Sequence, residues 1–527
     1  MIGHSAPRLD AVAKVTGQAH YPGDINLPGQ LWMKILFAGR PHARLRRLDT
    51  RRAEALPGVV AVLTAKDVPH NEYGLIVKDQ PVLCGPGSAR EGADVVRFVG
   101  DQVALVVAET EAVAAEALSL IEADYEDLPV ITDPRVAMQP GQPAILPGLE
   151  RNIFKHYRIR KGDVAAAWAE CEVVIEGEYH TPWQEHAYLQ PEAGVAYLDE
   201  QGRVTVMVAG QWAHEDQEQI AHALGLPQDQ VRVIYPAIGG AFGGREDMSV
   251  QIVLALAAWR LRRPVKIIWS RAESIIGHHK RHPYFIKAKW GAKRDGTLVA
   301  AEVELISDAG PYLYTSGKVL GNAALMASGP YDFPHVAVDA YTVATHNLPS
   351  GAFRGFGGPQ AAFAAEMQMN KLAEALGLDP VALRQKNLLT DESIWSVGTQ
   401  APPGNTLDKV VARCALEAGW EAQTPAKRAA RPAPPVPHLQ RGRGFACSYK
   451  NIGFSFGAPE SCWAKVELAG KDAIERVTVY HAGADCGQGA HTAFAQMAAH
   501  AAGVPAERVS VVASDTASSG SSGSTSA

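Results

Sequence analysis

Apolar residues occur along this chain in short runs separated by Gly, Pro and charged residues. The runs 31–39 (LWMKILFAG) and 59–65 (VVAVLTA) are apolar and rich in β-branched residues, which predicts strands. The segment 102–128 predicts a strand, then a helix, then a short strand. Residues 1–130 are therefore expected to form a small α+β or α/β domain.

A larger region with the same alternation follows. Residues 131–150 are rich in Pro and Gly and predict a linker. Within 151–420, the run 204–211 predicts a strand, whereas the segments 248–263 and 359–376 predict helices. We expect this region to be one mixed α/β domain.

The last part of the chain repeats a pattern of the middle part. A Pro- and Ala-rich stretch, 421–440, predicts an extended connector, and 441–527 follows it. Residues 210–233 and 487–511 share an opening Gly-Gln, an Ala-His pair, a Gly-x-Pro turn and a Val-x-Val run. Chance similarity of two helix–turn–strand units is the alternative, but the shared opening favours duplication.

The second copy continues into SDTASSGSSGSTSA, where the first copy continues into a glycine loop and a helix. Either this Ser/Gly text is a flexible end, or the unit continues elsewhere. The repeat favours the second, so we expect only the N-terminal part of the last domain. The predicted fold class is α+β or mixed α/β, with two related α/β domains after the first one.

Composition narrows the class of protein. The chain has 527 residues, of which 47% are hydrophobic and 20% charged, which excludes disordered and collagen-like classes. Its 49 glycines and 34 prolines favour many turns over a helical bundle. No apolar run is long enough to span a membrane, and the first residues do not resemble a signal peptide.

Charge and cysteine usage point to a cytoplasmic protein. The net charge is −6 and no basic stripe is present, so neither nucleic acid nor a membrane is an expected partner. The six cysteines are widely spread without CxxC spacing. This spacing argues against a zinc knuckle or an iron–sulfur cluster within the chain, and favours reduced thiols.

The first motif with chemical potential is the glycine loop 239–246 (GGAFGGRE), between a predicted strand and a predicted helix. Glycines let the backbone approach a ligand and present its N–H groups, and a helix N-terminus favours anions. The loop matches neither a Walker sequence nor a G-x-G-x-x-G fingerprint. A plain tight turn is the alternative, with Glu246 as an ordinary acid near a helix start.

Two further loops carry polar groups among glycines. In 352–360 (AFRGFGGPQ), Arg354 lies between aromatic residues and suits a planar substrate or an oxyanion, although it could also cap backbone carbonyls. In 485–489 (DCGQG), Gln488 offers an amide, and Gln211 opens the matching repeat. Alone, both glutamines are more typical of turn residues than of ligands.

The histidines of GHHKRHPY are the remaining candidate metal ligands. His278 and His282 have i, i+4 spacing, but the segment has no helical pattern and no acidic partner. We therefore expect these two and His279 to be solvated loop residues or core-edge histidines, not ligands.

Taken together, the three loops resemble those of the molybdenum-cofactor-binding large subunit of the xanthine dehydrogenase and aldehyde oxidase family. The segments 7–25 (PRLDAVAKVTGQAHYPGDI) and 96–110 (VRFVGDQVALVVAET) resemble its N-terminal hammerhead domain. The resemblance covers nearly the whole chain. It implies a hammerhead domain followed by two molybdopterin-binding domains.

The resemblance also implies which residues form the site. No side chain would bind molybdenum directly, because the pterin dithiolene holds it. Gln211 would lie beside the metal. Glu246 and Arg354 would face the substrate and polarise it. Phe454 or Phe456 would pack against the substrate as an aromatic wall. The cofactor-binding residues would be Gly240, Ala241, Phe242, Gly243, Gly244, Phe353, Arg354, Gly355, Gly487, Gln488 and Gly489.

The sequence departs from the family at the general base. That base is a Glu in a C-terminal G-x-G-E-type stretch, and no such stretch occurs in the right place here; Gly177-Glu178 lies before the loops, inside a strand-like run. The resemblance therefore implies that the base lies on a further segment or subunit. The carbon monoxide branch has Cys after the arginine of the second loop, whereas Gly355 follows here, which disfavours that branch.

The implied function is that of a molybdenum hydroxylase subunit. It would hydroxylate a purine-like N-heterocycle such as xanthine or hypoxanthine, with water as the oxygen source. The cofactor would be molybdopterin or its cytosine dinucleotide form, and electrons would leave through [2Fe-2S] and FAD partner subunits. The alternatives are an aldehyde or nicotinate-like oxidoreductase of the same family, and a non-catalytic cofactor-binding fragment that lacks the base.

Overall fold

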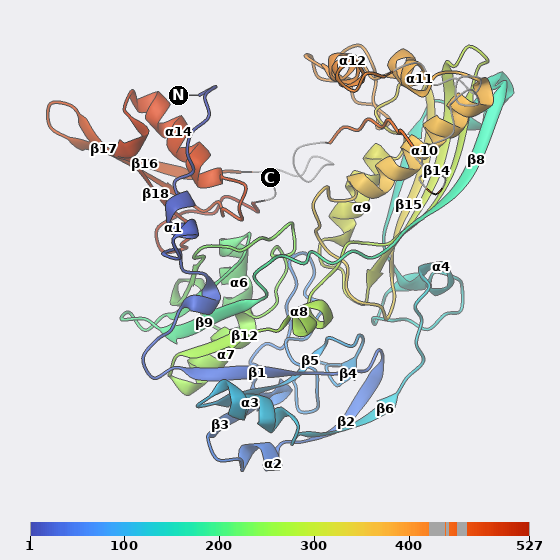
Figure 1. Cartoon of the computed structure of the whole chain (residues 1–527). Coiled ribbons are helices and arrows are strands. Elements are labelled where there is room, and N and C mark those ends of the chain that lie inside the picture. Colours follow the sequence, from blue (N-terminus) through green and yellow to red (C-terminus); the bar gives the residue numbers. More distant parts are fainter. Residues whose placement is uncertain (1, 421–437, 439–441, 451–460, 526–527) are drawn as a thin grey trace.

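The computed structural model describes residues 2–420, 438, 442–450 and 461–525 (Figure 1). The predicted connector 421–440 lies outside the described residues except for one position, as do Phe454 and Phe456. The described residues form two large sheets and two small ones, and helices pack against both large sheets.

The largest sheet joins the N-terminal region to the middle of the chain. Its order is β11-β10-β9-β12-β1-β5-β3, and β1 pairs in parallel with β12. The strands are β1 (Leu31–Phe37), β3 (Val59–Thr64), β5 (Gln102–Ala108), β9 (Ala193–Leu198), β10 (Val204–Val208), β11 (Val231–Ile234) and β12 (Val265–Ile268). The helices packed on it are α3 (Glu111–Leu118), α6 (Ala213–Leu224) and α7 (Gln251–Leu261).

Helix α7 shows why this sheet forms a core. The sequence predicted this helix, and its residues from Gln251 to Ala258 are all buried, so it is covered on every side. In strand β1, buried residues alternate with partly buried ones. In strand β5, every residue after the first is buried. The N-terminal region therefore folds onto the first large domain through one continuous sheet.

The N-terminal region also contains a small sheet of order β4-β2-β6, with β2 (Ala43–Asp49), β4 (Val95–Val96) and β6 (Glu122–Asp127). The helix α2 (Arg51–Glu54) and the 3₁₀ turn η2 (Ala65–Asp67) contact β3 of the largest sheet, and the 3₁₀ turn η1 (Pro22–Asp24) contacts β9 of that sheet. The short helix α1 (Ala11–Val15) lies near the start of the chain. The predicted linker 131–150 contains the short helix α4 (Pro134–Ala137).

A second large sheet has the order β7-β15-β14-β13-β8 and is covered by α9 and α10 (Figure 1). Its strands are β7 (Ile153–Lys161), β8 (Val173–Thr181), β13 (Tyr284–Ala292), β14 (Leu298–Gly310) and β15 (His335–Ala344). The helices around it are α5 (Val164–Ala167), α9 (Ser316–Met326), α10 (Gly358–Leu376), α11 (Pro380–Asn387) and α12 (Leu407–Glu417). Two short elements complete this part: η3 (Glu150–Asn152) and η4 (Trp168–Glu170). The short helix α8 (Arg271–Gly277) lies beside the largest sheet instead, because a Cβ on Gly277 would lie 2.8 Å from the Phe37 ring and 2.9 Å from the Trp269 ring.

The internal repeat is visible as two copies of one unit. In the first, the antiparallel pair β9–β10 is followed by α6, the turn η5 (Gln228–Gln230) and β11 parallel to β10. In the second, the pair β16 (Ala464–Gly470) and β17 (Ile474–His481) is followed by α14 (Ala490–Ala502), η6 (Ala506–Arg508) and β18 (Val509–Ala513). Left-handed glycines, Gly225 and Gly503, end both helices.

The two copies are joined at their last strands. Tyr235 N–H donates to the Ser514 carbonyl at 2.9 Å, and Asp515 accepts a bidentate pair of hydrogen bonds from Arg232 at 3.0 and 2.6 Å. Residues after β18 therefore extend the edge of the largest sheet beyond β11. This contact brings the Ser/Gly stretch next to the glycine loops.

Helix α10 allows a matched test of glycine at its two ends. Gly357 and Gly377 both have left-handed φ angles, +88° and +70°. A Cβ on Gly357 would lie 2.3 Å from the Val319 carbonyl oxygen, whereas one on Gly377 would meet nothing within 4 Å. We expect Gly377→Ala to cost about 1 kcal/mol, a drop of about 1 °C in melting temperature for a chain of this length, and Gly357→Ala clearly more. Equal melting temperatures for the two variants would contradict this account.

Candidate cofactor and substrate site

Two glycine loops touch through their backbones at the centre of the candidate site. A Cβ on Gly243 would lie 2.9 Å from the Ala352 carbonyl carbon, and Gly243 has a φ of +92°. The Arg354 N–H donates to the Phe242 carbonyl at 2.8 Å. Only glycine allows this approach, so the loops 239–246 and 352–360 form one unit.

Gln211 is buried and holds the first loop in shape. Its Oε1 accepts hydrogen bonds from the Gly243 N–H at 3.1 Å and from the Arg245 N–H at 3.3 Å. Its Nε2 donates to the Thr525 carbonyl at 2.7 Å. The side chain therefore links the first loop to the Ser/Gly stretch after β18.

Glu246 is fully buried in the turn before α7, and not at the helix start that the sequence suggested, since α7 begins at Gln251. Burial raises the pKa of Glu246 to about 7, and the nearby Ser524 hydroxyl only partly opposes this rise. Its Oε2 has no hydrogen-bond partner among the described residues. A carboxyl in this state can hold or donate a proton near neutral pH.

Arg354 lies on the second loop with an exposed side chain, so it is available to an incoming ligand. The loop around it is fixed from behind by Arg281. That guanidinium stacks over the Phe353 ring at 3.9 Å and donates to the Arg354 carbonyl at 2.8 Å. Phe242, on the first loop, is 44% exposed at a φ of +54°, which is rare for a residue other than glycine.

The third loop, 485–489, is organised by the Asp485 carboxylate. Its Oδ1 accepts from the N–H groups of Gly487 at 2.9 Å and Gly489 at 3.3 Å. The Gln488 amide closes the same loop, because its Oε1 accepts from Cys486 N–H at 2.7 Å and its Nε2 donates to Ala484. The Gln488 side chain thus shapes the loop, in which Gly487 and Gln488 are exposed.

The N-terminal segment fastens this third loop. Arg8 donates to the Gly487 carbonyl at 2.6 Å and lies 3.4 Å from Asp485. Leu9 N–H donates to the Thr492 hydroxyl at 3.1 Å, at the start of α14. The sequence alone indicates no role for Arg8, since its partners lie at the opposite end of the chain.

The expectation of solvated loop histidines was wrong, and the alternative of core histidines is closer to the structure. His278, His279 and His282 are each 2% exposed or less and form a buried group with His186. His186 and His279 both donate from Nε2 to the Ala352 carbonyl, at 2.8 and 3.2 Å, and His278 donates to the Gly244 carbonyl at 2.6 Å. Through these hydrogen bonds, the rings hold the backbones of both glycine loops. A local sequence pattern could not indicate this role.

The sequence also left Arg245 and the Ser/Gly stretch without a role. Arg245 donates from Nε to the Gly240 carbonyl at 2.8 Å, and its guanidinium lies over the Tyr188 ring at 4.1 Å. Thr525 hydroxyl accepts from the Ala484 N–H at 2.8 Å. The one available signal was the repeat, which placed the Ser/Gly text at the position of the first glycine loop.

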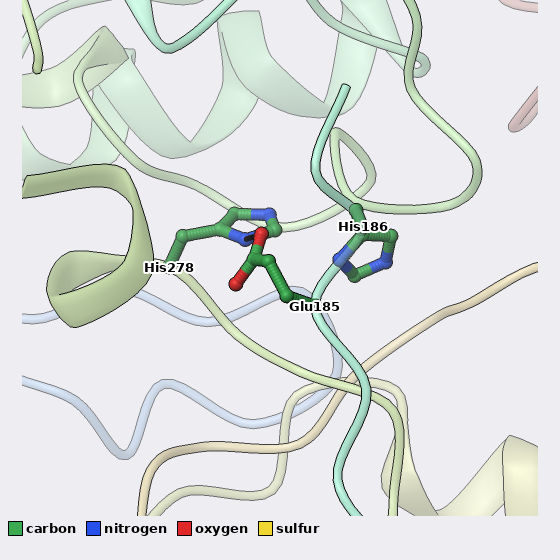
Figure 2. Close-up of side chains that lie close together, drawn as sticks. All are labelled: Glu185, His186 and His278. Atoms are coloured by element: carbon green, nitrogen blue, oxygen red, sulfur yellow. Dashed lines mark ion pairs between the residues drawn. The ribbon is translucent and has the colours of Figure 1, made fainter. Parts of the chain in front are cut away.

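The donor set of the three loops suits a metal held by an organic cofactor. The loops offer glycine backbone, amides and one thiol, Cys486, whose pKa burial raises to about 12, so it is not a metal-binding thiolate. A Cβ on Gly240 would lie 2.8 Å from Tyr188, and one on Gly244 would lie 2.9 Å from His186 and His278. In the described chain, the only group of three potential metal ligands lies beneath the loops, at Glu185, His186 and His278 (Figure 2).

Comparison with known domain families gives three consecutive matches. The "Aldehyde oxidase and xanthine dehydrogenase, a/b hammerhead domain" matches residues 16–129. Two families described as "Molybdopterin cofactor-binding domain" match residues 145–388 and 413–527. The fold and site thus define a hammerhead domain followed by molybdenum-cofactor-binding domains, which confirms the predicted fold class and cofactor.

Individual relatives agree. The chain is 34% identical over 524 residues to a probable xanthine dehydrogenase subunit of Bacillus subtilis, covering 99% of this chain and 67% of that protein. It is 39% identical over 412 residues to the nicotinate dehydrogenase large molybdopterin subunit of Eubacterium barkeri, covering 78% of this chain and 93% of that one. The chain therefore belongs to the molybdenum-binding subunits of the xanthine dehydrogenase and aldehyde oxidase family, whose members here are molybdenum-dependent oxidoreductases.

Solved structures show the same arrangement. Aldehyde oxidoreductase from Desulfovibrio gigas superposes with a TM-score of 0.86 at 28% identity. Quinoline 2-oxidoreductase from Pseudomonas putida 86 superposes with a TM-score of 0.85 at 25% identity. The alignments cover 98% and 99% of this chain, but 57% and 68% of those chains. Among the described residues, no helix has the length and apolarity needed to cross a membrane.

The buried Glu246 carboxyl makes stability depend on pH. The folded state keeps a proton up to about pH 7, whereas an unfolded Glu loses it near 4.5, so stability falls as pH rises between these values. Glu246→Gln removes this dependence. We expect the variant to match wild type near pH 4 and to exceed it at pH 8 by up to about 3 kcal/mol, measured by thermal unfolding. The control is Glu218→Gln, at an exposed site, whose stability relative to wild type should be the same at both pH values. If Glu246→Gln behaved like this control, the burial effect would be refuted.

Removal of Arg8 should loosen the third loop. Arg8→Ala deletes the hydrogen bond to Gly487, so we expect several-fold faster amide hydrogen exchange in the segment 485–491. The matched control is Arg51→Ala, since Arg51 pairs with Asp49 in the N-terminal region, away from this loop. Equal exchange in the loop for both variants would show that Arg8 does not fasten it.

Proposed function

We propose that this chain is the cofactor-binding catalytic part of a molybdenum hydroxylase acting on a purine-like N-heterocycle such as xanthine or hypoxanthine. The observation that carries the proposal is the backbone contact between the two glycine loops. This contact sets the buried carboxyl of Glu246 and the exposed guanidinium of Arg354 on adjoining turns. A buried proton donor and an exposed cation on adjoining turns match the two ends of a polarised heteroaromatic ring.

Glu246 would bind the ring through its proton. Because its pKa lies near 7, the carboxyl can donate a hydrogen bond to a ring nitrogen and share the proton as the nitrogen becomes more basic. Its unpaired Oε2 would be satisfied by such a contact. The carbonyls and rings packed around the loop keep water from competing.

Arg354 would stabilise negative charge that develops on the substrate. Its guanidinium is permanently charged and planar, and its backbone is fixed by Phe242 and Arg281. Fixed charge is effective because the site does not reorganise during the reaction. Phe242, partly exposed on the neighbouring loop, would pack against a flat ring.

The cofactor would lie against the three loops and the stretch after β18. Its holders would be the glycine backbone of 240–244, the second-loop residues Phe353 to Gly355, and the segment 487–489, with Gln211 beside the metal. When bound, the molybdenum cofactor supplies the two-electron oxidation of the substrate and the transfer of oxygen from water. The pterin is molybdopterin or its cytosine dinucleotide form.

The complete enzyme would require further parts. The carboxylate next to Glu246 is Asp247, and burial together with the Glu246 charge raises its pKa, so it is not poised as an ionised general base. The six cysteines of the described residues are free and scattered, and do not form a cluster site. We therefore propose that the base lies on a further segment or a separate molybdenum-domain subunit. Iron–sulfur and FAD subunits would carry the electrons away. The subunit names of the Bacillus and Eubacterium relatives support a heteromeric complex.

A nicotinate-like substrate is the second candidate. It is favoured by the 39% identity to the nicotinate dehydrogenase subunit and by the exposed Arg354, which could pair with a carboxylate. Oxidation of aldehydes is a third, weaker possibility, supported by the structural similarity to aldehyde oxidoreductase.

The test uses the complete complex with its cofactor and an artificial electron acceptor. We expect acceptor reduction with hypoxanthine or xanthine, and a loss of at least about 100-fold in kcat/KM for Glu246→Gln and Arg354→Met at unchanged molybdenum content. Turnover with nicotinate or an aldehyde alone would overturn the purine assignment. A fully loaded complex that oxidises none of them would indicate a non-catalytic cofactor-binding part.

A further inference from the structure

Beneath the glycine loops lies a three-residue group that the proposed reaction does not use. Glu185, His186 and His278 each offer one ligand atom, and these atoms all lie within 4.8 Å of one another (Figure 2). Glu185 and His186 precede β9, and His278 follows α8, so the tertiary structure alone brings them together. His186 and His278 are 6% and 2% exposed.

Both imidazoles are oriented as metal ligands are. Each donates its Nε2–H to a backbone carbonyl, of Ala352 and Gly244 respectively, which fixes the tautomer and leaves the Nδ1 lone pair unprotonated. Neither Nδ1 has a hydrogen-bond partner among the described residues. A second-sphere carbonyl on the remote nitrogen is the usual arrangement around a ligating histidine.

The carboxylate completes the set. Glu185 Oε1 faces His278 Nδ1 at 3.9 Å, whereas Oε2 pairs with the buried Lys280 ammonium at 2.6 Å. The other charged groups nearby are Arg281, Asp247 and His279, which lies 3.9 Å from Asp247. The Glu185 side chain is 20% exposed, which provides a route from solvent.

We propose that Glu185, His186 and His278 bind a divalent transition-metal ion, with Zn²⁺ as the best match. Two imidazole nitrogens and one carboxylate are a common three-ligand set for zinc, with the fourth position taken by water. Zinc ligands at about 2.0–2.1 Å lie about 3.4 Å apart, so the side chains need to close by less than about 1.5 Å. Lys280 would remain bonded to the outer oxygen of Glu185.

This ion would stabilise the site above it. His186 and His278 already bond the carbonyls of both glycine loops, and the His186 ring stacks on Phe353 at 4.1 Å. Linking the two rings would therefore couple the loops 239–246 and 352–360. The ion would stabilise the two loops separately from the molybdenum chemistry, with its fourth position open to water.

The test uses the full chain without a polyhistidine tag, produced in a host unable to make the molybdenum cofactor, so that it does not depend on the proposed function. The chain is stripped with a chelator, incubated with Zn²⁺ and dialysed, and zinc is then measured by mass spectrometry. We expect about one Zn²⁺ per chain and a higher melting temperature with the metal. His278→Gln and Glu185→Gln should each lower retained zinc at least about ten-fold.

The matched control is His346→Gln. His346 is also buried, and its Nε2 has no partner among the described residues, but it stacks on His42 and belongs to no three-ligand group there. This variant should keep its zinc. A stripped wild-type chain that takes up no zinc would overturn the proposal, and equal zinc in all variants would show an adventitious ion only. If His278→Gln fails to fold, the partly exposed Glu185→Gln still decides the result.

Discussion

The close backbone contact between two glycine loops is the constraint on which this molecule depends. At Gly243 there is no space for a Cβ, because the Ala352 carbonyl carbon lies 2.9 Å from its ideal position. The polar groups around this contact hold the two loops in place. Gln211 binds the first loop from one side, and buried histidines bind the carbonyls of both loops from below.

That contact requires elements distant in the sequence to be held rigidly. The largest sheet does this by joining β1 of the N-terminal region to β12 in the middle of the chain. The second repeat then adds to the sheet edge through Arg232 and Asp515. Thr525 consequently bonds both Gln211 and the Ala484 N–H before the third loop, and Arg8 ties the N-terminus to the third loop. Duplication of one β–β–α–β unit thus provides loops on both sides of a shared site.

Burial, more than pairing, sets the chemistry of the charged groups. Glu246 is buried without a cation beside it, so its proton is retained to near neutral pH. Arg354, on the adjoining loop, stays exposed and charged. Two neighbouring turns therefore present one neutral proton donor, Glu246, and one cation, Arg354. The two groups differ mainly in how deeply they are buried. Burial also lowers the pKa of His186 and His278, so these rings are neutral and can act as acceptors or ligands.

The sequence by itself determined the alternation of strands and helices, the repeat, and the three glycine loops, because these depend on local periodicity and on residues that tolerate unusual backbone angles. Helix α10 and strands β1 and β3 lie where the pattern predicted them. Only the tertiary structure decided the burial of Glu246, the role of Arg8 and the grouping of His186 with His278. Burial and long-range contacts arise from packing between segments far apart in the chain, and no local pattern encodes that distance.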